Sequence, residues 1–170
     1  EIGKTAVSLI ENNKVIFFDT STTVAALCQY VESNIEAYSH SLDNIEILSN
    51  HCLCQMMGGT YFKKNRYMYG SQTLNMIDQI YFDLAYVAAA AVMEDGIYVE
   101  EFEDAMIKKK VASRSQKVCL VVDHSKFNKK SSYKALAFQD IDVLVVDWLP
   151  DTYREKIEKA GCQIIYTKEK

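Results

Sequence analysis

The sequence is poor in the residues that separate domains, since its 170 residues include one proline and six glycines. Flexible linkers and domain boundaries are rich in both, so this scarcity favours a single domain and excludes a low-complexity segment. Long apolar runs are also missing, which excludes a helix that spans a membrane. We therefore expect one globular domain, residues 1–170, without membrane contact.

A concentrated basic region is missing as well, because the formal net charge is −4. Proteins that bind nucleic acid need a basic face that displaces counterions from the phosphates, so this chain is not expected to bind DNA by itself. The five cysteines are an odd number, which does not suit a framework of disulfides. Most lie in apolar segments, a pattern typical of reduced, buried thiols in a cytoplasmic protein.

The sequence also has no convincing metal motif. The cluster His51-Cys52-Leu53-Cys54 is the best candidate, but no second pair of ligands follows at a familiar spacing. We therefore expect neither a metal nor a cofactor.

What the sequence does contain is a regular alternation of helix-period and strand-period segments. Helices are predicted over residues 4–12, 23–32, 41–48, 71–80, 102–115 and 151–160. Strands are predicted over residues 14–18, 35–38, 53–57, 84–92, 117–122, 141–146 and 162–166, with irregular segments at 60–70 and 123–132. Such alternation, with uninterrupted apolar strands, predicts an α/β fold with a mainly parallel open sheet and helices on both faces.

A run of hydroxyl side chains follows the first predicted strand directly. Asp19 ends this strand, and Thr20, Ser21, Thr22 and Thr23 lead into the next helix. A helix start carries partial positive charge and N–H groups that have no partner inside the helix. The run therefore predicts a phosphate-binding loop. The alternative is that Thr22 or Thr23 only caps the helix.

Polar and glycine residues follow the other predicted strands too. In an open parallel sheet, ligands bind beyond the carboxyl ends of the strands, so these residues are predicted to share one site. Besides Asp19, they are Ser39-His40-Ser41, Gly58-Gly59-Thr60, Asp123-His124-Ser125-Lys126 and Asp147.

This set of residues suits a small anionic polyol. Hydroxyls and backbone N–H groups would hold a phosphate, and Lys126 or Lys108 would add positive charge. Asp19 and Asp123 would accept hydrogen bonds from sugar hydroxyls.

Simpler explanations of the same residues stay open. The aspartates after the strands also suit caps of strand-to-helix turns, and Gly58-Gly59 suits a tight turn alone. Asp104 and Lys108 are four residues apart and suit a solvated ion pair on one helix face. The tyrosine-rich segment 61–69 is assigned to packing or to a subunit contact.

Seven segments, in this order, resemble the C-terminal effector-binding domain of the DeoR family of bacterial transcription regulators, and the resemblance runs from about Ile2 to Tyr166. The family pattern Asp-x-Gly-Thr-Thr is similar to residues 19–23, Thr-Asn-Ser-Leu to residues 39–42, and Glu-Ala-x-x-Lys to residues 104–108. The family's double glycine resembles Gly58-Gly59, and a later glycine resembles Gly70. Its Asp-x-Ser-Lys-Phe is similar to residues 123–127, and its Ile-Asp-x-Leu-Ile-x-Asp to residues 141–147.

The resemblance implies the fold of ribose-5-phosphate isomerase, glucosamine-6-phosphate deaminase and coenzyme A transferases. It implies a non-catalytic sensor domain of a repressor of carbohydrate metabolism, a homo-oligomer that binds a phosphorylated sugar. DNA would be bound only through an N-terminal helix-turn-helix domain that this chain lacks. The abrupt start, inside a helix and without an initiator methionine, agrees with a piece of a longer protein.

The resemblance also distributes the site residues by role. The phosphate would be held by the hydroxyls of Thr20, Ser21, Thr22, Thr23, Ser39 and Ser41. The sugar would be contacted by Asp19, His40, Gly58, Gly59, Gly70, Asp104, Lys108, Asp123, Ser125 and Lys126.

Several positions depart from the family pattern. Ser21 replaces a glycine and His40 replaces an asparagine, whereas Ala88-Ala89-Ala90-Ala91 stands where the family has Gly-Ala-Asp-Gly. Phe62 stands where many members carry arginine. These changes indicate an altered effector or a weakened site. They keep two alternatives open: an isomerase-like or hydrolase-like enzyme of the same fold that acts on sugar phosphates, and an oligomerisation module with a degenerate ligand site.

Overall fold

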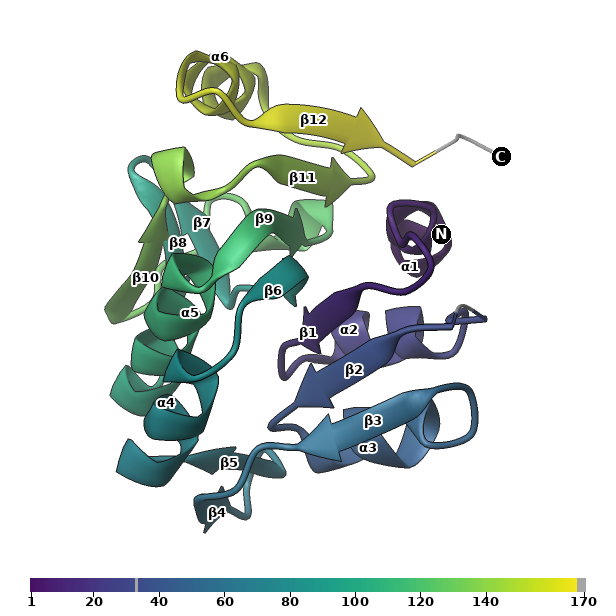
Figure 1. Cartoon of the computed structure of the whole chain (residues 1–170). Coiled ribbons are helices and arrows are strands. Elements are labelled where there is room, and N and C mark those ends of the chain that lie inside the picture. The colour runs from purple at the N-terminus through teal and green to yellow at the C-terminus, as the bar shows by residue number, and fades with distance from the viewer. Residues whose placement is uncertain (33, 168–170) are drawn as a thin grey trace.

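A computed structural model describes residues 1–32 and 34–167 of the chain (Figure 1). Its centre is a seven-stranded sheet in the order β12-β11-β9-β6-β1-β2-β3, in which every neighbouring pair is parallel. The strands are β1 (Val15–Phe18), β2 (Glu36–Ser39), β3 (Leu53–Met56), β6 (Phe82–Val87), β9 (Ser115–Val121), β11 (Val143–Val146) and β12 (Gln163–Tyr166). The predicted α/β fold class is confirmed.

Helices cover both faces of this sheet (Figure 1). The helices are α1 (Ile2–Val7), α2 (Thr22–Cys28), α3 (Leu42–Leu48), α4 (Ser71–Asp78), α5 (Phe102–Ser113) and α6 (Asp151–Lys159). Helices α1, α2 and α3 pack on one face, and α4 and α5 pack on the other. Several helices end earlier than predicted, α2 at Cys28 rather than at residue 32. No helix in the described ranges has the length and apolar character that a bilayer crossing requires.

Strand β1 shows how the two faces are filled. Successive side chains of a strand point to opposite sides of the sheet. Ile16 and Phe18 therefore join the core under α1 and α2, and Phe17 joins the core under α4 and α5. All three side chains are fully buried, as expected for a central strand of a parallel sheet. The strand thus places its carboxyl end, and Asp19 after it, in the middle of the molecule.

The prediction was wrong for the segment 60–70, which is a hairpin rather than an irregular loop. Strands β4 (Thr60–Phe62) and β5 (Tyr67–Tyr69) pair antiparallel. The hairpin is joined to the chain that follows β2 by backbone hydrogen bonds from Leu42 N to the Arg66 carbonyl, 2.9 Å, and from Met68 N to the His40 carbonyl, 2.8 Å. Three-residue strands are too short to show a clear period of two in a sequence.

The predicted strand over residues 84–92 is divided in the structure. Strand β6 ends at Val87, and β7 (Ala91–Met93) begins a separate antiparallel sheet in the order β10-β8-β7. Its other strands, β8 (Gly96–Val99) and β10 (Tyr133–Ala137), were not predicted. A continuous apolar run gives no sign of a bend within it. The prediction therefore merged β6 and β7, which belong to different sheets.

Candidate functional site

A cavity of about 400 Å³ lies beyond the carboxyl ends of β1, β2 and β6. Its walls come from the starts of α2 and α3, the turn of the β4–β5 hairpin, the segment after β6, the segment between β8 and α5, and α5 itself. The lining residues are Thr20, Ser21, Thr22, Ala25, Ser41, Asp43, Lys64, Asn65, Arg66, Tyr67, Ala88, Ala89, Ala90, Val99, Glu100, Glu101, Asp104 and Lys108. This is the edge at which the sequence placed a site.

The hydroxyl run that follows β1 forms one wall of the cavity. Thr20, Ser21 and Thr22 line it, whereas Thr23 is not among the lining residues. The Ser21 hydroxyl accepts a hydrogen bond from Val24 N at 2.9 Å and so caps α2. The capping alternative therefore holds for Ser21, one residue earlier than the sequence suggested, and the threonines keep their side-chain oxygens for other partners.

Of the two serines predicted to bind phosphate after β2, Ser41 lines the cavity and Ser39 does not. Ser41 lines the cavity while its hydroxyl accepts a hydrogen bond from Asn44 N at 3.3 Å, which caps α3. Ser39 is fully buried, and its hydroxyl donates to the Phe18 carbonyl at 2.6 Å. Ser39 therefore holds the ends of β1 and β2 together beneath the cavity.

Asn44 is a buried polar residue that the sequence reasoning missed. Its side-chain amide donates to the Phe18 carbonyl at 3.3 Å and to the Asp19 carbonyl at 2.8 Å. These bonds fix the path of the chain from β1 into the hydroxyl run. An asparagine inside a short predicted helix gives no sequence signal of this long-range role.

A buried ionic cluster forms the floor of the cavity. The Lys108 ammonium lies 2.8 Å from Asp19 Oδ2 and 2.6 Å from Asp104 Oδ1. Asp19 is fully buried and also accepts a hydrogen bond from Ala88 N at 3.1 Å. Asp104 and Lys108 are therefore not the solvated pair that their spacing alone allowed, because both face inward from α5 onto the end of β1.

Burial and charge shift the pKa values in this cluster. Burial alone lowers the pKa of Lys108, but the carboxylates of Asp104 and Asp19 outweigh it and the net pKa is raised. Burial raises the pKa of Asp104, against the opposing effect of the Lys108 ammonium. Lys108 is thus a fixed cation whose charge is already shared by two carboxylates.

His40 lies beside this cluster and is also fully buried. Its ring stacks on Phe17, with centroids 5.5 Å apart, and its Nε2 is 3.8 Å from Asp19 Oδ1. Neither ring nitrogen has a hydrogen-bond partner among the described residues. Burial lowers the pKa of His40 to about 3, so the ring is neutral near pH 7 and forms no ion pair with Asp19.

Three of these residues also have the composition of a metal site. Ligand atoms of Asp19, His40 and Asp104 all lie within 4.8 Å of one another. The Lys108 ammonium, however, contacts a carboxylate oxygen of both aspartates. The protein therefore already places one positive charge between these two carboxylates.

The turn of the β4–β5 hairpin brings Lys64, Asn65 and Arg66 into the cavity wall. Arg66 Nε lies 2.8 Å from Asp43 Oδ1, and its guanidinium is 3.6 Å from Glu46 Oε1. The sequence predicted packing or a subunit contact for this segment. Its basic residues were the available signal, but a turn that folds back over the next strand end cannot be inferred from local pattern.

Another part of the lining is acidic and also was not predicted. Glu100 and Glu101 line the cavity between β8 and α5, next to Asp104. Ala88, Ala89 and Ala90, where the chain leaves β6, also line the cavity. The lining therefore combines carboxylates with the exposed cations of the hairpin turn.

The remaining predicted residues lie elsewhere. Gly58, Gly59, Gly70, Asp123, Ser125 and Lys126 are not among the residues that line the cavity. The glycines belong to the hairpin connections: Gly59 has φ 149° and Gly70, at the start of α4, has φ 106°. Asp123 accepts a hydrogen bond from Ser125 N at 2.8 Å, as a turn cap does.

A second histidine–aspartate pair lies outside the cavity, in the segments that follow β9 and β11. His124 Nδ1 is 2.6 Å from Asp147 Oδ2, and the His124 side chain is 60% exposed. The hydrogen bond with Asp147 and its negative charge raise the pKa of His124 above its usual value. The structure thus splits the predicted edge into an enclosed part near β1 and an exposed part after β9 and β11.

The sequence of this chain matches a known class of regulatory domain. Residues 1–148 match the family model described as the DeoR C terminal sensor domain. The chain belongs to this family.

Individual relatives agree with this assignment. The chain is 27% identical over 173 residues to the HTH-type transcriptional repressor GlcR of Bacillus subtilis, an alignment that covers 99% of this chain and 67% of the relative. It is 27% identical over 170 residues to the deoxyribose operon repressor of Escherichia coli, an alignment that covers 96% of this chain and 68% of that repressor. The chain thus spans about two thirds of the length of these curated relatives.

A solved structure supports the fold. A ribose-5-phosphate isomerase in complex with phospho-erythronic acid has a TM-score of 0.54 to this chain, at 18% identity, over 74% of this chain and 51% of the isomerase. At this identity the likeness concerns the fold alone. It agrees with the fold group that the sequence resemblance implied.

Proposed function

We propose that this domain is the sensor of a transcriptional repressor of carbohydrate metabolism and that its effector is a phosphorylated sugar bound in the cavity beyond β1, β2 and β6. The observation that carries the proposal is the cavity itself, which combines threonine hydroxyls, flexible cations and a carboxylate wall around one space. Hydroxyls and cations suit a phosphate, and carboxylates suit sugar hydroxyls. Its volume of about 400 Å³ lies within the range of small-molecule sites.

The whole protein would then act as a switch. A ligand shifts a conformational equilibrium only through different affinities for the two states. We propose that the effector favours one arrangement of a homo-oligomer, and that a helix-turn-helix domain outside this chain binds the DNA. The names of the relatives, which are transcriptional repressors, support a role without catalysis.

A thermal-shift panel tests this function. Ribose 5-phosphate, glucose 6-phosphate, fructose 6-phosphate and glucosamine 6-phosphate are compared with their free sugars and with inorganic phosphate. A ligand that binds only the native state raises the Tm by mass action. We expect a rise with at least one phosphorylated sugar that exceeds the rise with its free sugar. A flat panel would reject the function and favour a degenerate site, and turnover of a panel member would indicate an enzyme.

The variant Thr22→Val tests the place of binding. The Thr22 side chain lines the cavity and is exposed, so the change removes one hydroxyl with little effect on folding. We expect about a tenfold loss of affinity for the phosphorylated sugar, the equivalent of one hydrogen bond to a charged group. The matched control Thr23→Val, outside the lining, is expected to bind normally. Equal affinity of Thr22→Val and the parent protein would reject this assignment.

A further inference from the structure

The cavity needs cations if it is to hold a phosphate, and three basic residues line it: Lys64, Arg66 and Lys108. Lys108 is the poorest candidate of the three. Lys108 is only 1% exposed, and its ammonium contacts two carboxylates at 2.8 and 2.6 Å. A phosphate that approached Lys108 would therefore also approach Asp19 and Asp104, and the repulsion would cancel much of the attraction.

The two cations of the β4–β5 turn are held differently. The Lys64 side chain makes no ion pair with any residue in the described ranges. Arg66 is paired with Asp43 and Glu46, but the side chains are 43%, 50% and 63% exposed. Exposed ion pairs are weak, so Arg66 can exchange a carboxylate for a phosphate. An arginine also matches a phosphate through two parallel hydrogen bonds.

The backbone of this turn is fixed, whereas its two basic side chains are exposed to solvent. The Arg66 carbonyl accepts a hydrogen bond from Leu42 N at 2.9 Å, next to Ser41 at the start of α3. An isolated bridge also joins Ser41 to Tyr67. The turn is thereby anchored to the same strand end that supplies Ser41 and Asp43 to the cavity. Two basic side chains on a fixed backbone cost less to order when a ligand binds than a free loop does.

From these contacts we propose that Lys64 and Arg66, on the turn of the β4–β5 hairpin, form the anion subsite of the cavity and select phosphorylated over free sugars. This proposal rests on the proposed function and adds which residues read the phosphate. Lys108 instead supplies one positive charge to Asp19 and Asp104. Glu100, Glu101 and Asp104 also line the cavity and would accept hydrogen bonds from the sugar hydroxyls.

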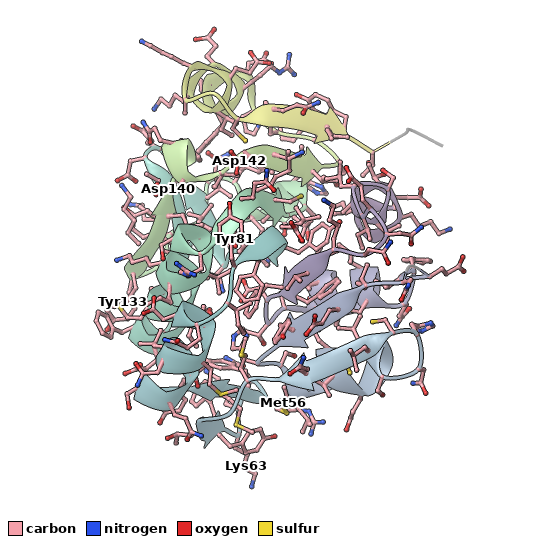
Figure 2. All side chains as sticks on the ribbon, viewed as in Figure 1. Met56, Lys63, Tyr81, Tyr133, Asp140 and Asp142 are labelled. Carbon is pink, nitrogen blue, oxygen red and sulfur yellow. The ribbon has the colours of Figure 1, made fainter. Side chains whose placement is uncertain are left out.

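The test uses the whole chain and the variants Lys64→Gln, Arg66→Gln and the double variant. The probes are the phosphorylated sugar that gives the largest shift in the panel, its free sugar, and inorganic phosphate, each titrated by calorimetry. The matched control is Lys63→Gln, which makes the same charge change one residue away. Lys63 points away from the body of the molecule (Figure 2) and is not among the lining residues.

We expect each single variant to bind the phosphorylated sugar about tenfold more weakly and the double variant up to about a hundredfold more weakly. Binding of the free sugar should stay within about twofold, and Lys63→Gln should match the parent protein for every probe. Lys64 is exposed, so Lys64→Gln keeps the test valid if Arg66→Gln lowers the Tm.

The outcomes separate the two proposals. If no phosphorylated sugar binds the parent protein, the proposed function fails and this inference fails with it. If a phosphorylated sugar binds the parent and the double variant equally, only the inference fails. An equal loss of affinity for the phosphorylated and the free sugar would also overturn it, since the turn would then not read the phosphate. Lys64→Arg keeps the positive charge, so binding close to that of the parent protein, in contrast to Lys64→Gln, would support the anion subsite.

Discussion

Two histidine–aspartate pairs lie at the same edge of the sheet, and they differ in almost every physical respect. His40 is fully buried, 3.8 Å from Asp19, and its pKa is lowered to about 3 by burial. His124 is 60% exposed, 2.6 Å from Asp147, and its pKa is raised by that partner. His40 is thus an uncharged packing element beside a carboxylate, whereas His124 is an exposed imidazole that is hydrogen-bonded to one.

The difference supports our proposal that a ligand binds at the enclosed part of the edge. Around Asp19 the protein encloses charged groups and supplies a counter-charge of its own, the Lys108 ammonium. Around Asp147 solvent screens the charges, and no enclosure is required. Ligand sites are concave and largely enclosed, so we place the effector in the first part of the edge.

The largest predicted effect comes from removing the buried cation. Lys108→Met leaves Asp19 and Asp104 facing each other without a counter-charge. Breaking a buried pair in this way typically lowers the free energy of unfolding by about 3–5 kcal/mol. Urea denaturation measures the change. The control Lys109→Met, at an exposed neighbouring position, should alter it by less than about 0.5 kcal/mol, and equal effects of the two variants would contradict the buried cluster.

The second prediction concerns the pH dependence of stability that His40 confers. The unfolded chain binds a proton at His40 near pH 6.5, whereas the folded protein binds it only near pH 3. The unfolded state therefore holds more protons between these values, and stability falls with decreasing pH by up to about 1.4 kcal/mol per pH unit. Asp104 opposes this trend, because its raised pKa favours the folded state as pH falls.

The variant His40→Phe isolates that contribution. Phenylalanine keeps the aromatic contact with Phe17 and loses no hydrogen bond to the described residues. Denaturation between about pH 5 and 7 should show a flatter profile for His40→Phe than for the parent protein. His51→Gln, at an exposed histidine, serves as the control and should keep the parent profile. Identical profiles for all three proteins would show that His40 titrates as an ordinary histidine.

The smallest effect is expected at the exposed pair. The raised pKa of His124 adds stability below its unfolded value near pH 6.5, and that stability is lost as pH rises through the folded pKa. His124→Gln should therefore lower the Tm slightly near pH 5.5 and leave it unchanged near pH 8.5. A loss that is larger at the higher pH would contradict the ion pair with Asp147.

The sequence predicts the parts of this account that depend on local pattern. The apolar segments give every strand of the main sheet, and Thr20, Ser21 and Thr22 line the cavity because they follow a central strand almost directly. Asp19 is buried behind the lining, where it contacts Lys108. The rule that ligands bind at strand ends names all seven ends, however, and the cavity uses only those near β1. Asp123 and Lys126 were selected by this rule and lie outside the lining.

The residues that the sequence missed depend on long-range packing. Lys64 and Arg66 reach the cavity because the β4–β5 hairpin folds back onto the chain after β2, a contact that no period reveals. Glu100 and Glu101 follow β8, a strand of the small sheet that was not predicted. Local pattern fixed which residues are polar and near a strand end, and tertiary packing decided which of them meet.

The two histidines offer the most direct test of where the effector binds, because each reports on one part of the edge. Imidazole NMR signals, assigned with His40→Phe and His124→Gln, are followed as the phosphorylated sugar with the largest thermal shift is added. Our account predicts that the His40 signals move in proportion to occupancy while those of His124 stay in place. Movement of His124 with no change at His40 would place the ligand in the exposed part of the edge and contradict the account.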